Sequence, residues 1–350
     1  MSQQDEDNNQ PTAAWSALLA ASDDDTKVIR MGSEDQSTAM IFKRVPEVPE
    51  GFPMGSRSIG YAQPVTRVVI EQEYWLSAFP ITQLQWRKGV EWIKQHPPSN
   101  WKELETINKL DPNPSRFKGD YLPVENVSWD DIRVWSSALS KLLDLGESKL
   151  ELRLPYESEW EWACRAVRRT DGKYQACTWE FNGLNHFGDG EPALEKCGWF
   201  EDNSESSTQR VGQKDPNALG LYDMHGNVWE WCTDLWLENY SGYWDGITMQ
   251  ELISVNSGGG NGRRVVRGGG WFNSAWWCQS ANRNRWWPDD RGRGRGFRVG
   301  LFPGPNRASS SKTQADWEQR REAGPLRDSA ESQRDGLSSM SLPPRSGRNF

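Results

Sequence analysis

Hydrophobic side chains recur at helical spacing in the first half of the chain. Trp86, Val90 and Ile93 lie four and three residues apart, which predicts a helix that ends at His96, just before two prolines. The same spacing follows Ser128, a residue type that caps the first turn of helices, and predicts a second helix there. Each of these helices should bury one face.

A third helix is predicted in the run LRLPYESEWEWACRAVR, where Pro155 can open the helix and acidic side chains favour its first turn. β-Branched and aromatic residues at 65–70 and 75–81 predict strands. Residues 170–213 are rich in Gly, Asn and acidic side chains, so we expect packed irregular structure or a functional lid there.

The two ends of the chain differ from its middle. Residues 1–40 are polar and acidic and are predicted to be mostly disordered, because their one apolar island, at 13–21, is too short for a helix that is stable alone. A structured domain is expected from 41 to 302. Residues 303–350 form a polar tail of Ser, Arg, Pro and Gln that is also predicted to be disordered.

Tryptophan dominates the composition. The chain holds 21 Trp in 350 residues while only 35% of its residues are hydrophobic, so the core should depend on aromatic side chains. No apolar run of about 18 residues exists, so no membrane helix is expected. The acidic N-terminus lacks the features of a secretory signal, which predicts a cytoplasmic protein. Five cysteines without a CxxC pair fit thiols in a reducing compartment.

Trp and Arg are concentrated in residues 263–299. This stretch holds five Trp and nine Arg against two Asp, although the whole chain has a formal net charge of −8. Both residue types are enriched on binding surfaces, whereas the alternative is a loop-rich core filled with indoles. On an extended chain neighbouring side chains face opposite ways, so one Trp of each doublet, 276–277 and 286–287, should face outward or line a cleft.

Four blocks of the sequence resemble the formylglycine-generating enzyme, or sulfatase-modifying factor, family. They are FPMGS at 52–56, LPYESEWEWA at 154–163, GLYDMHGNVWEW at 220–231, and the stretch from RGGGW to GFR at 267–298. The resemblance implies a single irregular α+β domain, related to the C-type lectin fold and low in regular secondary structure.

The resemblance also implies a calcium site. The family ligands correspond to Asp223, the carbonyls of Gly226 and Val228, and Glu230, and oxygen ligands along a tight turn are what calcium requires. The alternative is that Asp223 and Glu230 cap a turn and pair with an arginine.

Catalytic members of the family hold copper(I) between two cysteines five residues apart, near a serine. The matching positions here are Asn273, Cys278 and Gly270, so only one thiolate ligand is present. Copper binding and formylglycine generation are therefore not expected. Cys278 is a weak catalytic candidate, since it fits a packed apolar side chain better than a reactive thiol.

The last block also resembles the variable segment of ligand-binding members of this fold, including targets of diversity-generating retroelements. The candidate ligand-binding residues are Phe272, Asn273, Trp276, Trp277, Trp286, Trp287, Asp290, Arg291, Arg293 and Arg295. A protein, peptide or glycan ligand would suit these aromatic and guanidinium groups.

Nucleic acid is the competing partner, because the Arg residues at 291, 293 and 295 alternate and could follow a phosphate backbone. It is the less favoured one, since the chain has a pI of about 5.2. The sequence thus predicts a ligand- or protein-binding module of this fold. The alternative is a copper or non-haem iron oxidase or oxygenase that acts on thiol or protein substrates, although the chain has only three His.

Overall fold

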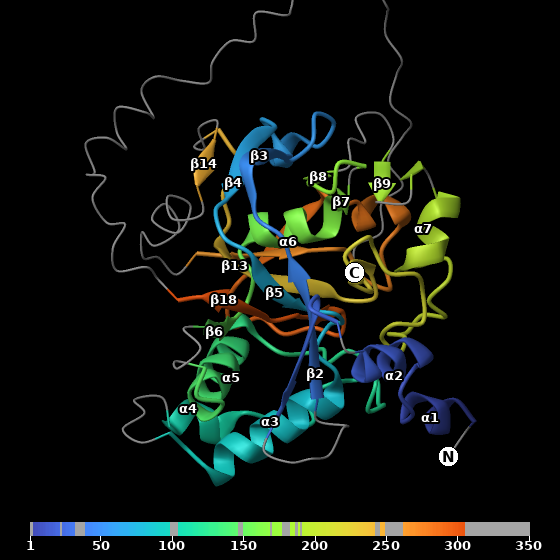
Figure 1. The fold of residues 1–350 in the computed structure, drawn as a ribbon. Helices are drawn as coiled ribbons and strands as arrows, with labels where there is room; N and C mark the ends of the chain where they lie inside the picture. The colour runs from blue at the N-terminus through green and yellow to red at the C-terminus, as the bar shows by residue number, and fades with distance from the viewer. Residues whose placement is uncertain are drawn as a thin grey trace, which may run out of the picture.

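The computed structural model describes residues 3–21, 23–31, 39–98, 104–145, 150–168, 170–176, 183–185, 188–189, 191–241, 246–248 and 262–304. Figure 1 shows their arrangement. The helices are α1 (Gln3–Asn8), α2 (Ala13–Ala20), α3 (Gln83–Gln95), α4 (Leu104–Lys109), α5 (Trp129–Leu142), α6 (Glu157–Arg165) and α7 (Glu191–Cys197), with 3-10 turns η2 (Gly60–Ala62) and η3 (Ala275–Cys278). The strands are β1 (Thr26–Arg30), β2 (Ala39–Val45), β3 (Val48–Met54), β4 (Thr66–Ile70), β5 (Tyr74–Ser77), β6 (Leu150–Arg153), β7 (Ala166–Arg168), β8 (Tyr174–Ala176), β9 (Gly183–Asn185), β10 (Gly188–Asp189), β11 (Gly198–Trp199), β12 (His225–Gly226), β13 (Trp229–Leu235), β14 (Ile247–Thr248), β15 (Arg264–Arg267), β16 (Arg283–Trp286), β17 (Arg295–Gly296) and β18 (Gly300–Pro303).

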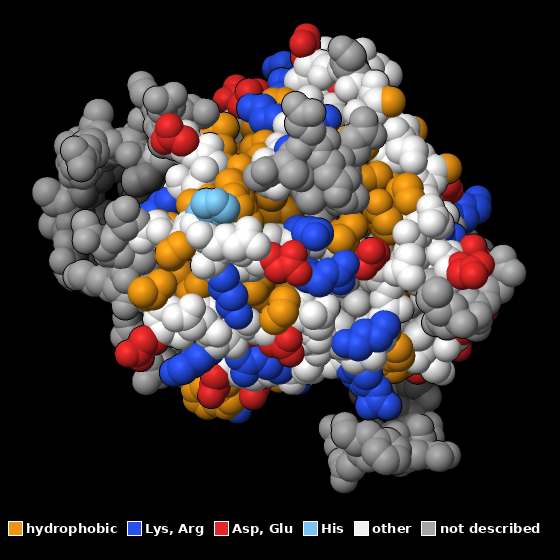
Figure 2. Space-filling model, turned by 90° about the horizontal axis from the view of Figure 1, so that it is seen from below, with side chains coloured by type: hydrophobic (Ala, Val, Ile, Leu, Met, Phe, Trp, Pro, Cys, Tyr) orange, Lys and Arg blue, Asp and Glu red, His pale blue; other side chains and the backbone are white. Residues whose placement is uncertain are grey.

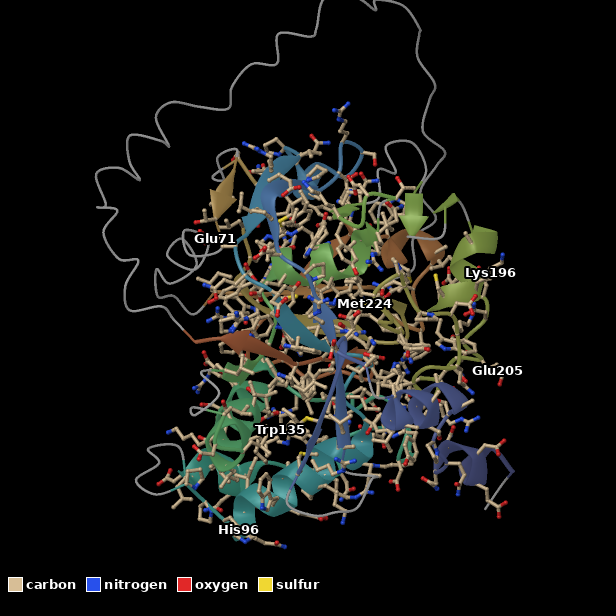
Figure 3. All side chains as sticks on the ribbon, viewed as in Figure 1. Glu71, His96, Trp135, Lys196, Glu205 and Met224 are labelled. Carbon is tan, nitrogen blue, oxygen red and sulfur yellow. The ribbon has the colours of Figure 1, made fainter. Side chains whose placement is uncertain are left out.

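A five-stranded antiparallel sheet joins the two ends of the domain, in the order β1-β2-β5-β18-β6. Helices α3 and α5 lie together beside it, at the bottom of Figure 1. Their apolar faces meet through the stacked rings of Trp86 and Trp135, whose centroids are 5.5 Å apart, and Phe297 packs edge-on against both. Figure 3 shows Trp135 inside this lower core. The aromatic core that the composition predicts is therefore present.

Helix α6 is the centre of the other half of the molecule. In Figure 1 it lies between the three-stranded sheet β14-β4-β3 and the four-stranded sheet β16-β15-β13-β17. All nine of its residues are buried. Its acidic side chains are compensated inside the fold, because Glu157 accepts hydrogen bonds from Arg283 at 2.7 and 2.8 Å, and Glu161 pairs with Arg267 and Arg165. Thus α6 anchors the segment that carries the candidate site.

The N-terminal segment corrects one prediction. Within the region expected to be mostly disordered, residues 3–8 and 13–20 are helical and residues 26–30 form the edge strand β1. The reason is tertiary: Trp15 is buried, stacks on Phe79 with centroids 5.2 Å apart and meets Tyr121 edge-on. A helix too short to be stable alone is stabilised by this contact. Most of the predicted C-terminal tail, residues 305–350, lies outside the described residues.

The predicted helices are confirmed. Helix α3 ends at Gln95 with His96 as its C-cap, and Ser128 caps α5 by accepting a hydrogen bond from the amide of Asp131 at 3.1 Å. Helix α6 follows Pro155 as expected. The α+β class and the irregular single domain are also confirmed. In the described part of the chain, no helix is both long and apolar enough to cross a membrane.

Candidate functional site: an aromatic and arginine face

The candidate site is built on the four-stranded sheet. Strand β15 pairs with β13 and β16 in antiparallel fashion, and β17 pairs with β13 in parallel, which places Arg295 opposite Trp229. The loops between these strands carry the predicted ligand-binding residues. We call the set Phe272, Trp276, Trp277, Trp286, Trp287, Arg293 and Arg295 the Trp/Arg face.

Both Trp doublets are divided as predicted. Trp276 is 43% exposed and Trp287 is 47% exposed, whereas Trp277 and Trp286 are half-buried. The two half-buried indoles pack edge-on against the buried ring of Trp229, with centroid distances of 6.2 and 5.9 Å. The exposed Trp276 meets Trp277 edge-on at 4.7 Å and therefore stands on this packed group of rings, whereas Trp287 follows the packed Trp286 directly in the chain.

Phe272 is the third exposed aromatic side chain, at 40%. It lies directly over two glycines, because a Cβ at Gly294 would come within 2.2 Å of its ring and one at Gly270 within 3.3 Å. Any side chain at Gly294 would displace Phe272. The ring also meets Trp271 edge-on at 5.2 Å.

Asn273 connects three segments beneath the Trp/Arg face by hydrogen bonds. Its side-chain oxygen accepts hydrogen bonds from the indole of Trp229 at 2.7 Å and from the amide of Gly270 at 3.0 Å, and its carbonyl accepts one from Glu201. The side-chain amide of Asn273 thus fixes the turn, so Asn273 contributes to the framework rather than to the set of outward-facing contacts.

The three alternating arginines do not form one track. Arg291 makes a bidentate pair with Asp131, at 2.9 and 2.8 Å. Arg293 lies 5.3 Å from the ring of Trp271, and Arg295 lies 4.4 Å from the ring of Trp286. Asp290, which was predicted to contact a ligand, accepts a hydrogen bond from the backbone amide of Trp287 at 3.1 Å.

Trp229 and Arg263 belong to the site but were not among the predicted residues. Trp229 sits on β13 beneath the two doublets, and the guanidinium of Arg263 lies 5.3 Å from the ring of Trp287. The proximity of Trp229 to Trp286 depends on the pairing of β13 with β15 and of β15 with β16, which local spacing does not encode. Arg263 could have been identified from the sequence, because it opens the same Arg-rich stretch.

Cys278 is a packed thiol. It is fully buried in a small apolar cluster with Cys197, Leu194, Phe200 and Ala275, and burial raises the pKa of its thiol well above the usual range. Burial likewise raises the pKa of Cys197 to about 12. Both thiols therefore stay protonated at neutral pH and lack the thiolate that nucleophilic chemistry requires. Among the described cysteines no disulfide is formed.

His225 supports the same region. Its Nδ1 lies 2.7 Å from the carbonyl oxygen of Cys278 and therefore donates to it, which leaves Nε2 to accept from the thiol of Cys164 at 3.5 Å. Burial lowers the pKa of His225 to about 4, so the ring is neutral at physiological pH. Both ring nitrogens of His225 are therefore engaged in hydrogen bonds inside the fold.

The residues of the implied calcium site do not fit calcium. Both carboxylate oxygens of Glu230 accept hydrogen bonds from Arg298, at 2.6 and 2.8 Å, and the indole of Trp160 adds a third at 2.6 Å. Asp223 accepts from the amide of Gly212 at 2.8 Å, and burial raises its pKa to about 6. The described residues contain no group of three or more His, Cys, Asp or Glu placed to hold a metal.

Gly226 and Val228, the other two implied ligands, lie within this turn. The backbone of Trp199 passes so close to Gly226 that a Cβ there would lie 1.9 Å from its carbonyl oxygen, and the φ of Gly226 is +84°. Val228 is buried, and its side chain packs near Gly296. The turn is thus a tight bend in which Glu230 pairs with Arg298, and the calcium site stays a prediction.

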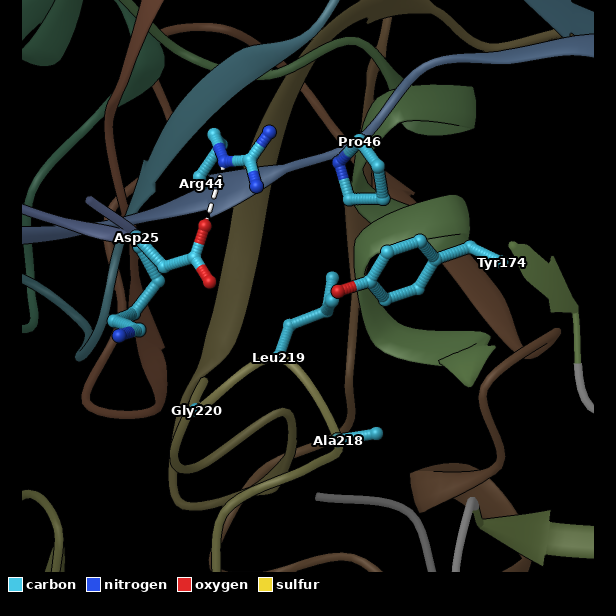
Figure 4. A pocket seen from close by; sticks show the side chains of 8 residues that line it. Asp25, Arg44, Pro46, Tyr174, Ala218, Leu219 and Gly220 are labelled. Carbon is cyan, nitrogen blue, oxygen red and sulfur yellow. Dashed lines mark hydrogen bonds and ion pairs between the residues drawn. The ribbon is translucent and has the colours of Figure 1, made fainter. Parts of the chain in front are cut away.

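A separate small cavity of about 190 Å³ lies between β2, β8 and the loop that contains Leu219 and Gly220. Figure 4 shows Arg44 on its wall, in contact with Asp25 at 2.6 Å. Arg44 also reaches Glu73, and the amine of Lys43 lies 2.7 Å from the hydroxyl of Thr26. Since these cations already have partners and the volume is below that of usual ligand pockets, the cavity is a weak candidate.

The chain is similar to proteins of known function. The chain is 27% identical to the formylglycine-generating enzyme of Mus musculus over 214 residues, which cover 57% of this chain and 48% of that protein. It is 25% identical to the chaperone protein LppX of Paenibacillus barcinonensis over 240 residues, or 58% of this chain and 70% of that one. The chain thus spans about half the length of the mouse enzyme.

Solved structures share the fold. The variable protein 1 of Treponema denticola superposes with a TM-score of 0.60 at 24% identity, covering 79% of this chain and 99% of that one. The family model for the sulfatase-modifying factor enzyme 1-like domain matches residues 30–300, which is most of the chain. The protein therefore belongs to the sulfatase-modifying factor enzyme 1-like domain family.

Proposed function

We propose that this protein is a ligand-binding module that grips a protein or peptide partner with the Trp/Arg face. The observation that carries the proposal is the exposure of Phe272, Trp276 and Trp287 on one strand-and-loop framework. Large aromatic side chains seldom stay in water without a binding role, because each can bury a large area on a partner. Their foundation of packed rings limits the entropy lost on binding.

The chemistry of the neighbouring residues supports binding over oxidation. By the family resemblance Asn273 stands where a copper ligand would be. Its side-chain oxygen accepts a hydrogen bond from Trp229, and the thiol of Cys278 is buried and protonated. A variable protein and a chaperone among the similar proteins also support a binding role.

Nucleic acid is less well supported. Arg291 is neutralised by Asp131, and the acids at 289–290 would repel a phosphate chain. Figure 2, which views the molecule from the side of α3 and α5, shows Lys and Arg interspersed with Asp and Glu on that face as well.

A pull-down with matched variants tests the proposal. The double variant Trp276→Ala/Trp287→Ala should lose a partner that the wild type retains from cell extract. Leu104→Ala is the control, since Leu104 is 44% exposed on α4, outside the face. If the double variant, shown to be folded by circular dichroism, retains every partner, the proposal is wrong. Stoichiometric copper or iron together with oxygen uptake on thiol substrates would instead favour the oxidase alternative.

A further inference from the structure

Arg295 differs from the other arginines of its segment. Its guanidinium lies between the ring of Trp286, 4.4 Å from the centroid, and the bare Cα of Gly292, where a Cβ would come within 2.9 Å of its Nη2 atom. The side chain is half-buried. The guanidinium is thus in close contact with Trp286 and Gly292, and these contacts restrict its position.

This guanidinium has no hydrogen-bond acceptor among the described residues, and its Nη1 atom is buried without one. Burial lowers the pKa of Arg295, and the nearby Asp290 offsets only part of that effect. By contrast, Arg291 has a carboxylate partner, and Arg267, Arg283 and Arg298 are buried in ion pairs with acids. An arginine that is fixed in place but unpaired is a ready anion anchor.

Building on the proposed binding role of the Trp/Arg face, we propose that its partner is an acidic peptide segment whose carboxylate binds Arg295 while apolar side chains pack on Trp276 and Trp287. The charge complementarity is local: the guanidinium of Arg295 is half-buried against an aromatic ring, and its buried Nη1 atom has no acceptor. A single carboxylate flanked by apolar or aromatic side chains matches that arrangement.

A phosphate backbone matches it less well. Successive phosphates need successive cations, yet Arg291 is already paired and Arg293 lies over Trp271, away from the indole that carries Arg295. Only Pro288 separates the exposed Trp287 from the carboxylates of Asp289 and Asp290. One anion can avoid them, whereas a long polyanion cannot.

The test begins with selection of a random dodecapeptide display library on the full chain. Selected peptides should be enriched in Asp or Glu next to aromatic or aliphatic residues. Fluorescence anisotropy then compares the best peptide with an analogue in which its acid is replaced by the amide. On the wild type, the analogue should bind about tenfold more weakly, since a charge-assisted hydrogen bond is lost.

The variants isolate the anchor. On Arg295→Gln the acid and its amide analogue should bind within about twofold of each other, whereas Arg291→Gln should keep the tenfold ratio. Gly292→Ala keeps the charge but displaces the guanidinium, and it should weaken only the acidic peptide. Thermal melts confirm that each variant is folded. Because Gly292→Ala does not substitute Arg295, it provides an independent test if the Arg295→Gln variant is unstable.

The outcomes separate the two proposals. Apolar peptides that need Trp276 and Trp287 but carry no acid would overturn the carboxylate anchor and leave the binding role standing. An equal ratio on wild type and Arg295→Gln, or displacement of the peptide by oligothymidine with steep salt dependence, would also overturn it. A wild type that selects no peptide would overturn both.

Discussion

The buried pair of Arg298 and Glu230 gives a sharp test of how this fold is held together. Both side chains are fully buried, and Arg298 binds both carboxylate oxygens of Glu230. Its guanidinium also donates to the carbonyls of Ser77 at 2.9 Å and Tyr222 at 2.8 Å. We expect Arg298→Met, which keeps an unbranched apolar side chain but removes the charge and the donors, to be strongly destabilising.

The magnitude follows from what is left behind. In the variant the Glu230 carboxylate keeps only the indole of Trp160 as donor, and the carbonyls of Ser77 and Tyr222 lose their hydrogen bonds from the guanidinium. Removing one partner of a buried pair costs about 3–5 kcal/mol because the other charge stays desolvated. For a domain of this size that corresponds to a fall in melting temperature of roughly 10 °C.

Urea titration followed by tryptophan fluorescence measures this cost. Arg44→Met is the control, since Arg44 pairs with Asp25 at 2.6 Å but its side chain is 37% exposed, so its loss should cost less than about 1 kcal/mol. In Arg298→Met/Glu230→Gln the cost should be well below the sum of the single variants. If Arg298→Met is no less stable than the control, or if a calcium chelator lowers wild-type stability by several kcal/mol, Glu230 is a metal ligand and the ion-pair assignment is wrong.

Three further predictions concern other parts of the fold. Burial and the neighbouring Glu157 raise the pKa of Asp234 to about 7, so the folded state binds the proton of this carboxyl more tightly than the unfolded state does. The free energy of unfolding should therefore fall, by up to ~4 kcal/mol, as the pH rises from about 4 through 7. Asp234→Asn should remove this pH dependence in urea titrations, and an equal pH dependence in the wild type and the variant would contradict the prediction. Because Cys278 is buried and its thiol is protonated, N-ethylmaleimide should leave it unmodified in the native protein and should label it after unfolding, as measured by peptide mass spectrometry. Rapid labelling of the native protein would mean that this thiol is accessible. Trp15→Ala should cost about 3–5 kcal/mol in thermal or urea unfolding, because α2 docks through that indole, and a cost below about 1 kcal/mol would show that the N-terminal helices contribute little.

Local signals predicted the helices well. The cap at Ser128 and the apolar spacing of α3 are encoded within a few neighbouring residues, and these elements form where expected. The family blocks predicted the fold class for the same reason, since each block is a short run of fixed composition. The docking of α2 could not be found this way, because Trp15 is stabilised by Phe79 and Tyr121, residues far along the chain.

The burial of the arginines was the feature least predictable from the sequence. Arg267, Arg283 and Arg298 belong to the Arg-rich stretch, yet all three are buried and pair with acids 68 to 126 residues earlier in the chain. A count of nine arginines therefore overstated the charge available at the surface. Local spacing does not distinguish an arginine that is buried against Glu157 from one that is exposed to solvent. That distinction depends on which strands are paired.

The glycines that alternate with arginines between residues 291 and 296 have a different structural role from the one that the sequence pattern suggests. Glycine and arginine in alternation are typical of a flexible, cationic track for nucleic acid, and that reading gave Arg291, Arg293 and Arg295 one common face. In the structure Gly292 makes room for the guanidinium of Arg295, and Gly294 makes room for the ring of Phe272. The missing side chains are therefore spaces that other side chains fill. Because those spaces fix where one arginine and one aromatic ring lie, the segment is a shaped contact surface, and its specificity should depend on the glycines as much as on the side chains they accommodate.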